Sequence, residues 1–405
     1  MYKKTPSNKT NSHQPLITTI IVLLLAAVLL VTGGIIWKTL DARSNSDGSA
    51  REVEVQEQTH SMELDTDTVI DADATHNAAT SQSVENQVGV YQIAYEQDGQ
   101  TWVVDSTGAN KKRLLGRTDV LEWKSADELS YAICDAEGCR VAVIDPETNA
   151  SERVWDAPPS VQSILAMSWY GDDLVVMTRG ALIQGNMIDD MAVYLINTAA
   201  DTSRELIALL PMSVRPVART DRIDLQFNAD GSAVMVLNTF ISKNGVWSTE
   251  GRLLYQPPQR EYQMIGFDKQ GSFYVKHYMP TTRTWELLTY DANTFELKST
   301  ESFFSGDHER VAPDGSKICY DREIDGEYDQ LYVHTMGGED QPLAQDFAFC
   351  KWVGTEQLLA VNTGGNQQKF AWQSLDVLDA LTGKIQAEVA NGEKLTDFAV
   401  APQPK

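Results

Sequence analysis

The sequence after Val88 contains no long segment with helical periodicity. Short runs of strand-forming residues, alternating or wholly apolar, are instead separated by Gly, Asp, Asn and Pro. Runs of this kind, bounded by turn formers, are typical of β-strands joined by tight turns. The pattern argues against a helical bundle and favours an all-β domain.

Positive charge is scarce. Lys and Arg number 33 against 57 Asp and Glu, which gives a formal net charge of -24. Residues 1–40 carry +4 and residues 41–88 carry -9, so residues 89–405 carry the remaining -19. Because so acidic a domain repels phosphate backbones, we expect no nucleic-acid partner.

Charged residues are absent from Leu16 to Trp37, a 22-residue apolar run. At about 1.5 Å per residue, a helix of this length would span roughly 33 Å and cross the hydrocarbon core of a membrane. Lysines precede the run and acids dominate after it. The positive-inside rule then predicts a cytoplasmic tail at 1–15, a transmembrane helix at 16–38 and an extracytoplasmic remainder. A cleaved signal peptide is the alternative, but the run exceeds the usual apolar region of about 7–15 residues.

Aromatic residues are absent from residues 39–88, which are rich in Ser, Thr, Asn, Gln and acids. Such a composition cannot bury enough apolar surface to fold, so we expect an acidic disordered linker. Four aspartates in it alternate in a way that suggests calcium: Asp65, Asp67, Asp71 and Asp73. The Gly and the terminal Glu of an EF-hand loop are missing, which favours solvated linker charge.

Cysteine is also scarce, with four residues. Cys134 and Cys139 flank the tip of a predicted hairpin and could form a disulfide if their Cβ atoms approach to about 4 Å. Cys319 and Cys350 lie in consecutive repeats and form either a second disulfide or two buried thiols. No second cysteine pair lies at ligand spacing, so zinc is the weaker interpretation, and we expect neither a metal nor a cofactor.

One residue position, usually bulky, recurs near the end of seven predicted inner strands. Its copies are Trp123, Trp169, Phe227, Phe267, Ala312, Trp352 and Phe398, at spacings of 46, 58, 40, 45, 40 and 46 residues. A period of about 40–45 residues is that of four-stranded propeller blades. We expect the aromatic copies to be wedges packed between blades.

A second type of strand, often ending in a turn opened by Asp or Asn, also recurs seven times. The chain begins with this second type and ends with the first. One blade is therefore complete only if the strand near Phe398 pairs with those at Gln92–Tyr95 and Thr101–Asp105, which also removes an exposed sheet edge. The sequence predicts, over 89–405, an all-β propeller of seven four-stranded blades closed by its N- and C-terminal strands and preceded by one transmembrane helix. Six blades is the alternative, if the repeat around Phe227 is an insertion.

Two repeats carry a resemblance to a known family. APDGSKICY, from Ala312 to Tyr320, and DGQTWVVDSTGANKKRLL, from Asp98 to Leu115, resemble TolB-type propeller repeats, whose inner hairpin reads S-P-D-G-x-x-I-x-Φ. The resemblance implies a non-catalytic propeller outside the cytoplasm that acts through protein contacts. TolB-type propellers usually have six blades and an extra N-terminal domain, where this chain has an apolar run and a spacer.

Catalytic motifs are few. Serine peptidases with the same propeller type need a G-x-S-x-G nucleophile elbow, which the sequence lacks. Asp307, His308 and Glu309 precede an inner strand, where blade-entry loops face the central channel. They are candidate ligand residues at the channel mouth, and the alternative is hydrogen bonding between neighbouring blades.

Three connections between second and third strands are longer than the repeat requires: 180–191, 239–251 and 363–373. Their apolar residues are the candidates for partner binding: Ile183, Met187, Ile188, Phe240, Trp247, Phe370 and Trp372. Aromatic and Met enrichment on a rigid scaffold is typical of recognition surfaces. The alternative is that each loop folds back onto its own blade.

These observations predict a single-pass protein of the cell membrane, anchored through residues 16–37. Its extracytoplasmic propeller would be a non-catalytic protein-binding or scaffold module of the envelope, with other envelope or membrane proteins as partners. The alternative is a propeller that binds a carbohydrate or another ligand, or a hydrolase-type enzyme, with its site in the central channel. Turnover or a bound glycan or metal would favour the alternative, and a channel without clustered acids or His would count against it.

Overall fold

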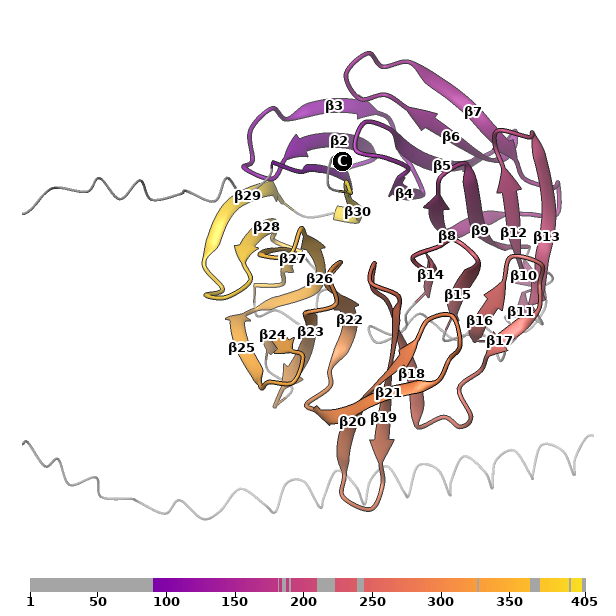
Figure 1. Ribbon diagram of the computed structural model, residues 1–405. Coiled ribbons are helices and arrows are strands. Elements are labelled where there is room, and N and C mark those ends of the chain that lie inside the picture. Colours follow the sequence, from indigo (N-terminus) through magenta and orange to yellow (C-terminus); the bar gives the residue numbers. More distant parts are fainter. Residues whose placement is uncertain are drawn as a thin grey trace, which may run out of the picture. The chain divides into compact units, whose positions relative to one another are not determined.

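Seven antiparallel sheets of four strands are arranged as a ring in the computed structural model (Figure 1). The structure describes residues 90–180, 182–183, 187–188, 191–209, 223–238, 244–325, 328–364, 372–392 and 395–402. The predicted tail, membrane helix and linker at 1–88 lie outside these ranges. Within the ranges, no helix is long and apolar enough to cross a membrane.

The blades are numbered by the order in which their inner strands follow the chain, starting from the closing blade. Blade 1 contains β1 (Gln92–Gln97), β2 (Gln100–Asp105), β3 (Lys112–Leu115) and β30 (Leu395–Val400). Blade 2 contains β4 (Val120–Trp123), β5 (Leu129–Asp135), β6 (Gly138–Ile144) and β7 (Ser151–Asp156). Blade 3 contains β8 (Ser163–Tyr170), β9 (Asp173–Arg179), β12 (Met191–Asn197) and β13 (Thr202–Leu209).

The remaining blades follow the chain without interruption. Blade 4 contains β14 (Ile223–Phe227), β15 (Ala233–Asn238), β16 (Gly245–Ser248) and β17 (Leu253–Tyr255). Blade 5 contains β18 (Tyr262–Phe267), β19 (Ser272–Met279), β20 (Thr284–Asp291) and β21 (Leu297–Phe303). Blade 6 contains β22 (Asp307–Val311), β23 (Lys317–Ile324), β24 (Tyr328–Thr335) and β25 (Asp340–Gln345). Blade 7 contains β26 (Phe347–Val353), β27 (Gln357–Asn362), β28 (Ser374–Asp379) and β29 (Ile385–Asn391).

The two ends of the ring are joined as the order of strand types predicts. β30 pairs antiparallel with β1, from Ile93↔Val400 to Gln97↔Leu395. The strand near Phe398 therefore becomes the innermost strand of blade 1. The repeat around Phe227 forms a blade of its own, so the six-blade alternative is wrong.

The Pro-Asp-Gly turn at Pro313–Gly315 joins β22 to β23, as its sequence predicts. The Asp314 carboxylate accepts hydrogen bonds from the Ser316 backbone N–H at 3.0 Å and its hydroxyl at 2.7 Å. Gly315 has a φ of +72°, and a Cβ there would lie 2.2 Å from the Asp268 carboxylate of the preceding blade. Only glycine satisfies both requirements, so this turn also fixes how closely blades 5 and 6 approach.

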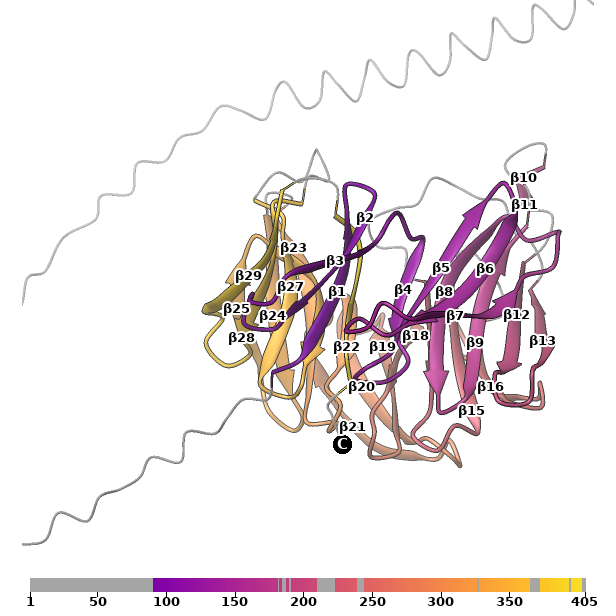
Figure 2. The same ribbon diagram turned by 90° about the horizontal axis from the view of Figure 1, so that it is seen from above.

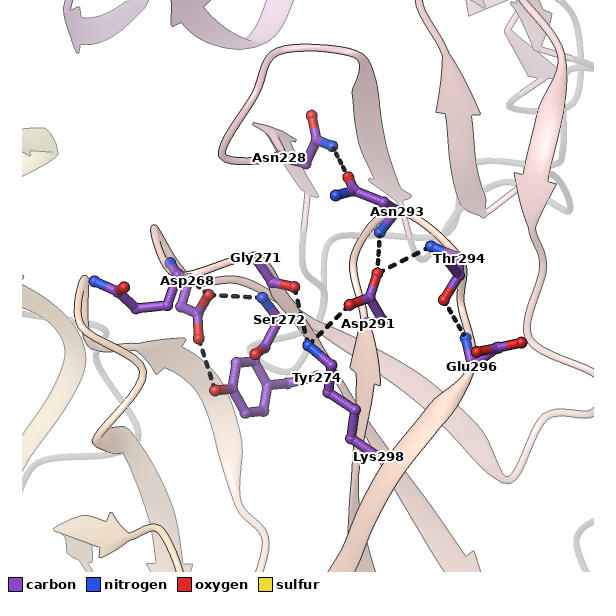
Figure 3. Close-up of polar contacts among 11 residues, drawn as sticks. Asn228, Asp268, Gly271, Ser272, Tyr274, Asp291, Asn293, Thr294, Glu296 and Lys298 are labelled. Carbon is purple, nitrogen blue, oxygen red and sulfur yellow. Dashed lines mark hydrogen bonds and ion pairs between the residues drawn. The ribbon is translucent and has the colours of Figure 1, made fainter.

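Five of the seven turns between third and fourth strands have an Asp or Asn at the first position, and Figure 3 shows the one at Asp291. The Asp291 carboxylate accepts the backbone N–H groups of Asn293 at 2.9 Å and Thr294 at 3.0 Å, and it lies 3.0 Å from the Lys298 Nζ. These contacts favour the charged form and lower the pKa of Asp291 to about 2. The same local bonding explains why Asp and Asn recur at this position of the repeat.

The aromatic copies of the recurring position pack between blades, as predicted. Trp123, Phe227, Phe267, Trp352 and Phe398 are all buried, and Trp169 is half-buried. Trp352 of blade 7, for example, joins a cluster that includes Ala312, Cys319 and Leu331 of blade 6. Burying one such side chain contributes about 1.5–3 kcal/mol or more, which makes these wedges a main source of cohesion between blades.

All four cysteines are bridged. Cys134 and Cys139 face each other across β5 and β6 with Cα atoms 4.0 Å apart, which confirms the predicted hairpin disulfide. Cys319 of β23 is bridged to Cys350 of β26, with Cα atoms 6.3 Å apart. The second pair therefore forms a covalent link between blades 6 and 7 rather than two thiols.

Candidate ligand site in the central channel

Five charged residues from five different blades meet where the inner strands converge. They are Glu122 on β4, Asp224 on β14, Arg310 on β22, Lys351 on β26 and Asp397 on β30. Glu122 interacts electrostatically with each of the other four. Residues from blades that are not neighbours can interact in this way only around the axis of the ring. We call these five residues the channel cluster.

One ion pair of the channel cluster spans a whole blade. An Arg310 guanidinium nitrogen lies 3.3 Å from a carboxylate oxygen of Asp224, although blade 5 separates their strands. Both side chains are about a quarter exposed, at 28% and 23%. The pair is therefore partly hydrated, and its charges partly offset each other inside the channel.

Asp397 and Lys351 are held by the unpaired edges of the inner strands. The Asp397 carboxylate accepts the N–H groups of Leu121 and Phe398, each at 2.8 Å. The Lys351 Nζ donates to the Phe398 carbonyl and lies 4.8 Å from the centroid of the Phe398 ring. Both side chains satisfy backbone groups that the sheets leave open, so both have a positioning role.

Two acids of the cluster, Asp397 and Glu122, have a pKa that burial raises. Burial raises the pKa of Glu122 from 4.5 to about 7; Lys351 and Arg310 lower it, while Asp397 and Asp224 raise it further. A carboxyl with such a pKa is present in both protonation states near neutral pH. It can therefore donate or accept a hydrogen bond to a ligand, or transfer a proton.

The predicted channel-mouth residues divide into two groups. The His308 Nδ1 lies 2.9 Å from the Asp321 carboxylate. The pKa of Asp307 is raised, mainly by burial and further by the negative charges of Asp321 and Glu309. Glu309 forms a buried ion pair with Lys276 of β19. For Glu309, the structure matches the alternative of a contact between neighbouring blades. Among the described residues, no group of His, Cys, Asp and Glu is arranged to hold a metal ion.

The apolar binding candidates are only partly described. Met187 and Ile188 form β11 (Met187–Ile188), whereas Phe240 and Phe370 lie outside the described residues. Trp247 was expected in the long connection 239–251, but the third strand of blade 4, β16, begins inside that range and includes it. Its ring is half-buried against a core cluster.

Trp372 is the first residue of the described range 372–392 and packs against the core of blades 1 and 7. Its ring centroid lies 5.6 Å from that of Phe349, and its side chain is half-buried. At both tryptophans the side chain contacts its own scaffold. Partner binding by these residues stays a prediction.

The channel cluster was missed by sequence reasoning, although a signal exists. Glu122, Lys351 and Asp397 each directly precede a wedge residue, at Trp123, Trp352 and Phe398. Successive residues of a strand lie on opposite sides, so a charged residue next to a buried wedge cannot share its apolar environment. A recurring charge at that position would have indicated the channel.

The ring of seven four-stranded blades defines the fold as a β-propeller, and comparisons with known proteins agree with that. No family model and no curated protein sequence matches the chain. Solved structures do: TolB from Acinetobacter baumannii is 12% identical, with a TM-score of 0.44 over 78% of this chain and 67% of that one. The periplasmic gluconolactonase PpgL from Pseudomonas aeruginosa is 13% identical, with a TM-score of 0.49 over 78% and 100%.

An oligogalacturonate lyase in complex with manganese is also similar, at 13% identity and a TM-score of 0.50 over 76% of this chain and 83% of that one. At these identities the likeness shows the fold alone. The chain has seven blades, and TolB is among the propellers to which it is similar. The chemistry of the site must come from its own residues.

Proposed function

We propose that this chain is a membrane-anchored, extracytoplasmic propeller that binds other envelope or membrane proteins without catalysing a reaction on them. The observation that carries the proposal is a small hairpin that belongs to none of the seven blades. It consists of β10 (Leu182–Ile183) and β11 and is inserted between β9 and β12 of blade 3.

The composition of this hairpin supports a binding role. Its paired residues are Leu182↔Ile188 and Ile183↔Met187, all of them large and apolar. Large apolar residues concentrated in a connection that leaves a rigid scaffold are typical of recognition surfaces. Figure 2 shows the hairpin at one end of blade 3, beyond β9 and β12.

The extracytoplasmic location is supported by two independent features. The uncharged run from Leu16 to Trp37 has the length of a membrane span and lysines only on its N-terminal side. Both cysteine pairs form disulfides, which persist in oxidising compartments and are rare in the cytosol. A rigid disulfide-linked ring outside the membrane would present a constant surface to its partners.

A second candidate function has its own observation. The channel cluster brings three acids together with two cations, and Glu122 has the perturbed pKa that is typical of functional carboxyls. A small ligand in the channel, bound or transformed by Glu122, is the alternative. Turnover or ligand binding that is lost in Glu122→Gln but kept in Glu128→Gln, a half-exposed acid of the same blade, would favour it.

The binding proposal is tested by cross-linking in intact membranes. The full chain carrying Met187→Ser and Ile188→Ser is compared with a control carrying Leu297→Ser and Ile385→Ser. The control removes two exposed apolar side chains, 55% and 48% accessible, from the outer strands β21 and β29. We expect cross-linked partners to disappear in the hairpin variant and to persist in the control. Equal recovery of the same partners from both variants would refute the assignment of the hairpin.

A further inference from the structure

A surface pocket of about 400 Å³ opens between the outermost strands of blades 5 and 6. It lies between the end of β21 and the start of β25, which are outermost strands. The channel cluster is on the innermost strands, at the other side of each blade. Its lining consists of Ser302, Phe304, Tyr332, Gly338, Glu339 and Asp340. Pockets of this size suit small ligands or parts of larger ones.

Two aromatic rings form the apolar wall. Phe304 is 45% exposed, an unusual position for Phe, and its ring centroid lies 5.5 Å from that of Tyr332. Tyr332 in turn stacks on the buried Tyr320, with centroids 5.3 Å apart and planes 7° from parallel. The wall is therefore a fixed aromatic surface supported from below.

The polar side of the pocket is equally fixed. The Asp340 carboxylate accepts the Tyr320 hydroxyl at 2.6 Å and the Phe304 N–H at 3.1 Å, and it lies 3.1 Å from the Nδ1 of the buried His334. Burial opposes ionisation of Asp340, but the hydrogen bonds from His334 and Tyr320 outweigh it and lower its pKa. Asp340 is thus an ionised acceptor whose charge is already compensated by three donors.

Arg322 completes the site. Its guanidinium lies 4.1 Å from the centroid of the Phe304 ring. Within the described part of the chain, no carboxylate lies at ion-pair distance from Arg322. The guanidinium therefore brings hydrogen-bond donors and a positive charge to the exposed ring of Phe304 at the pocket.

The charges and shapes together select one ligand class. An anion would meet Glu339 and Asp340, and a cation would meet Arg322 and a carboxylate already saturated with donors. A neutral ring with hydroxyl groups fits both halves, because it can stack on an aromatic wall and bond to donors and acceptors at the edge. We propose that this pocket binds an uncharged sugar of a glycan.

The site is tested with the full chain, purified in detergent, on an array of neutral, acidic and basic oligosaccharides. The neutral glycan with the strongest signal is then titrated against the wild type and variants. Phe304→Ala removes the exposed stacking surface, and Arg322→Met removes the donors but keeps a long side chain. We expect each to weaken binding by about tenfold. Leu297→Ala, which removes an exposed apolar side chain from the far end of β21, the strand that precedes Phe304, is the control and should bind like the wild type.

Each outcome decides the proposal. Binding of a neutral glycan that both variants weaken supports it, and Arg322→Met keeps the test valid if Phe304→Ala fails to fold. Binding of none of the neutral glycans, unchanged affinity in a folded Phe304→Ala, or selection of acidic or basic glycans would overturn it. The experiment is independent of partner capture by the hairpin, so the two proposals fail separately.

Discussion

Blade 6 and blade 3 follow the same four-stranded plan but are held in different ways. Blade 6 is linked to blade 7 by the Cys319–Cys350 disulfide and to blade 5 by the Glu309–Lys276 ion pair. Blade 3 contains no cysteine, its inner strand β8 carries no charged residue, and it bears the β10–β11 hairpin. The difference suggests that blade 6 is a structural clamp and that blade 3 is where the ring is extended for contact.

Removing the ionic clamp should have the largest effect. Glu309→Ala leaves the Lys276 ammonium buried without its carboxylate, and breaking a buried pair in this way costs about 3–5 kcal/mol of the free energy of unfolding. Chemical denaturation of the propeller measures this loss. The double variant Lys276→Met/Glu309→Leu should recover most of it, and a single variant within about 1 kcal/mol of wild type would contradict the clamp.

The disulfide that links blades 6 and 7 should stabilise the protein more than the disulfide within blade 2. Disulfides typically contribute about 2–4 kcal/mol, more when the closed loop is longer. Cys319 and Cys350 are 31 residues apart, whereas Cys134 and Cys139 are 5 apart. We therefore expect Cys319→Ala/Cys350→Ala to be the less stable of the two double variants in thermal melts. The reverse order would show that the link between blades is not a clamp.

The channel cluster predicts a pH dependence. The pKa of Glu122 is raised from 4.5 in the unfolded chain to about 7 in the folded chain, so the folded state binds more protons between these values. Stability from this residue is full below about pH 4.5 and is lost as the pH rises through 7, by up to about 3 kcal/mol. Glu122→Gln should therefore stabilise the protein at pH 8 and not at pH 5. An equal effect at both values would contradict the raised pKa.

Equivalent turns of the two blades offer a smaller and closely matched comparison. Gly315 in blade 6 and Gly171 in blade 3 both have positive φ, at 72° and 58°, but only Gly315 has neighbouring atoms where a Cβ would lie. Gly171→Ala should cost about 1 kcal/mol from backbone strain alone. Gly315→Ala should cost at least about 1 kcal/mol more, because Asp268 must move. Equal losses would mean that the turn does not set the spacing of the blades.

The hairpin should contribute least to stability. Replacing residues 182–188 by a short Gly-Ser turn removes β10 and β11, which pair with each other and with no other strand among the described residues. We expect the melting temperature of the propeller to stay within about 2 °C of the wild type. A larger drop would mean that the hairpin supports blade 3 and is not an addition to it.

Much of the ring could be predicted from local chemistry. Turn formers, the wedge position and the order of strand types predicted the seven blades and the pairing of β1 with β30, because each depends on residues adjacent in the chain. The channel cluster depends on five strands that are far apart in sequence. A single charged residue does not indicate which side of its strand faces the axis, so the cluster could not be predicted. Trp247 was assigned to a loop because β16 is only four residues long.

The pocket between blades 5 and 6 could not be predicted from the sequence for the same reason. Phe304, Tyr332 and Arg322 come from three different elements of two blades, and only their packing brings the aromatic rings and the guanidinium together. None of the three stands out in a single repeat. Sites built between blades therefore need the structure, whereas the blades themselves can be read along the chain.

We propose that partners bind where blade 3 departs from the repeat, at the β10–β11 hairpin. The most direct measurement is partner capture by cross-linking in membranes with the chain that lacks residues 182–188. The account predicts that this chain folds with an unchanged melting temperature and captures none of the partners of the wild type. Capture of the same partners at wild-type yield would contradict it.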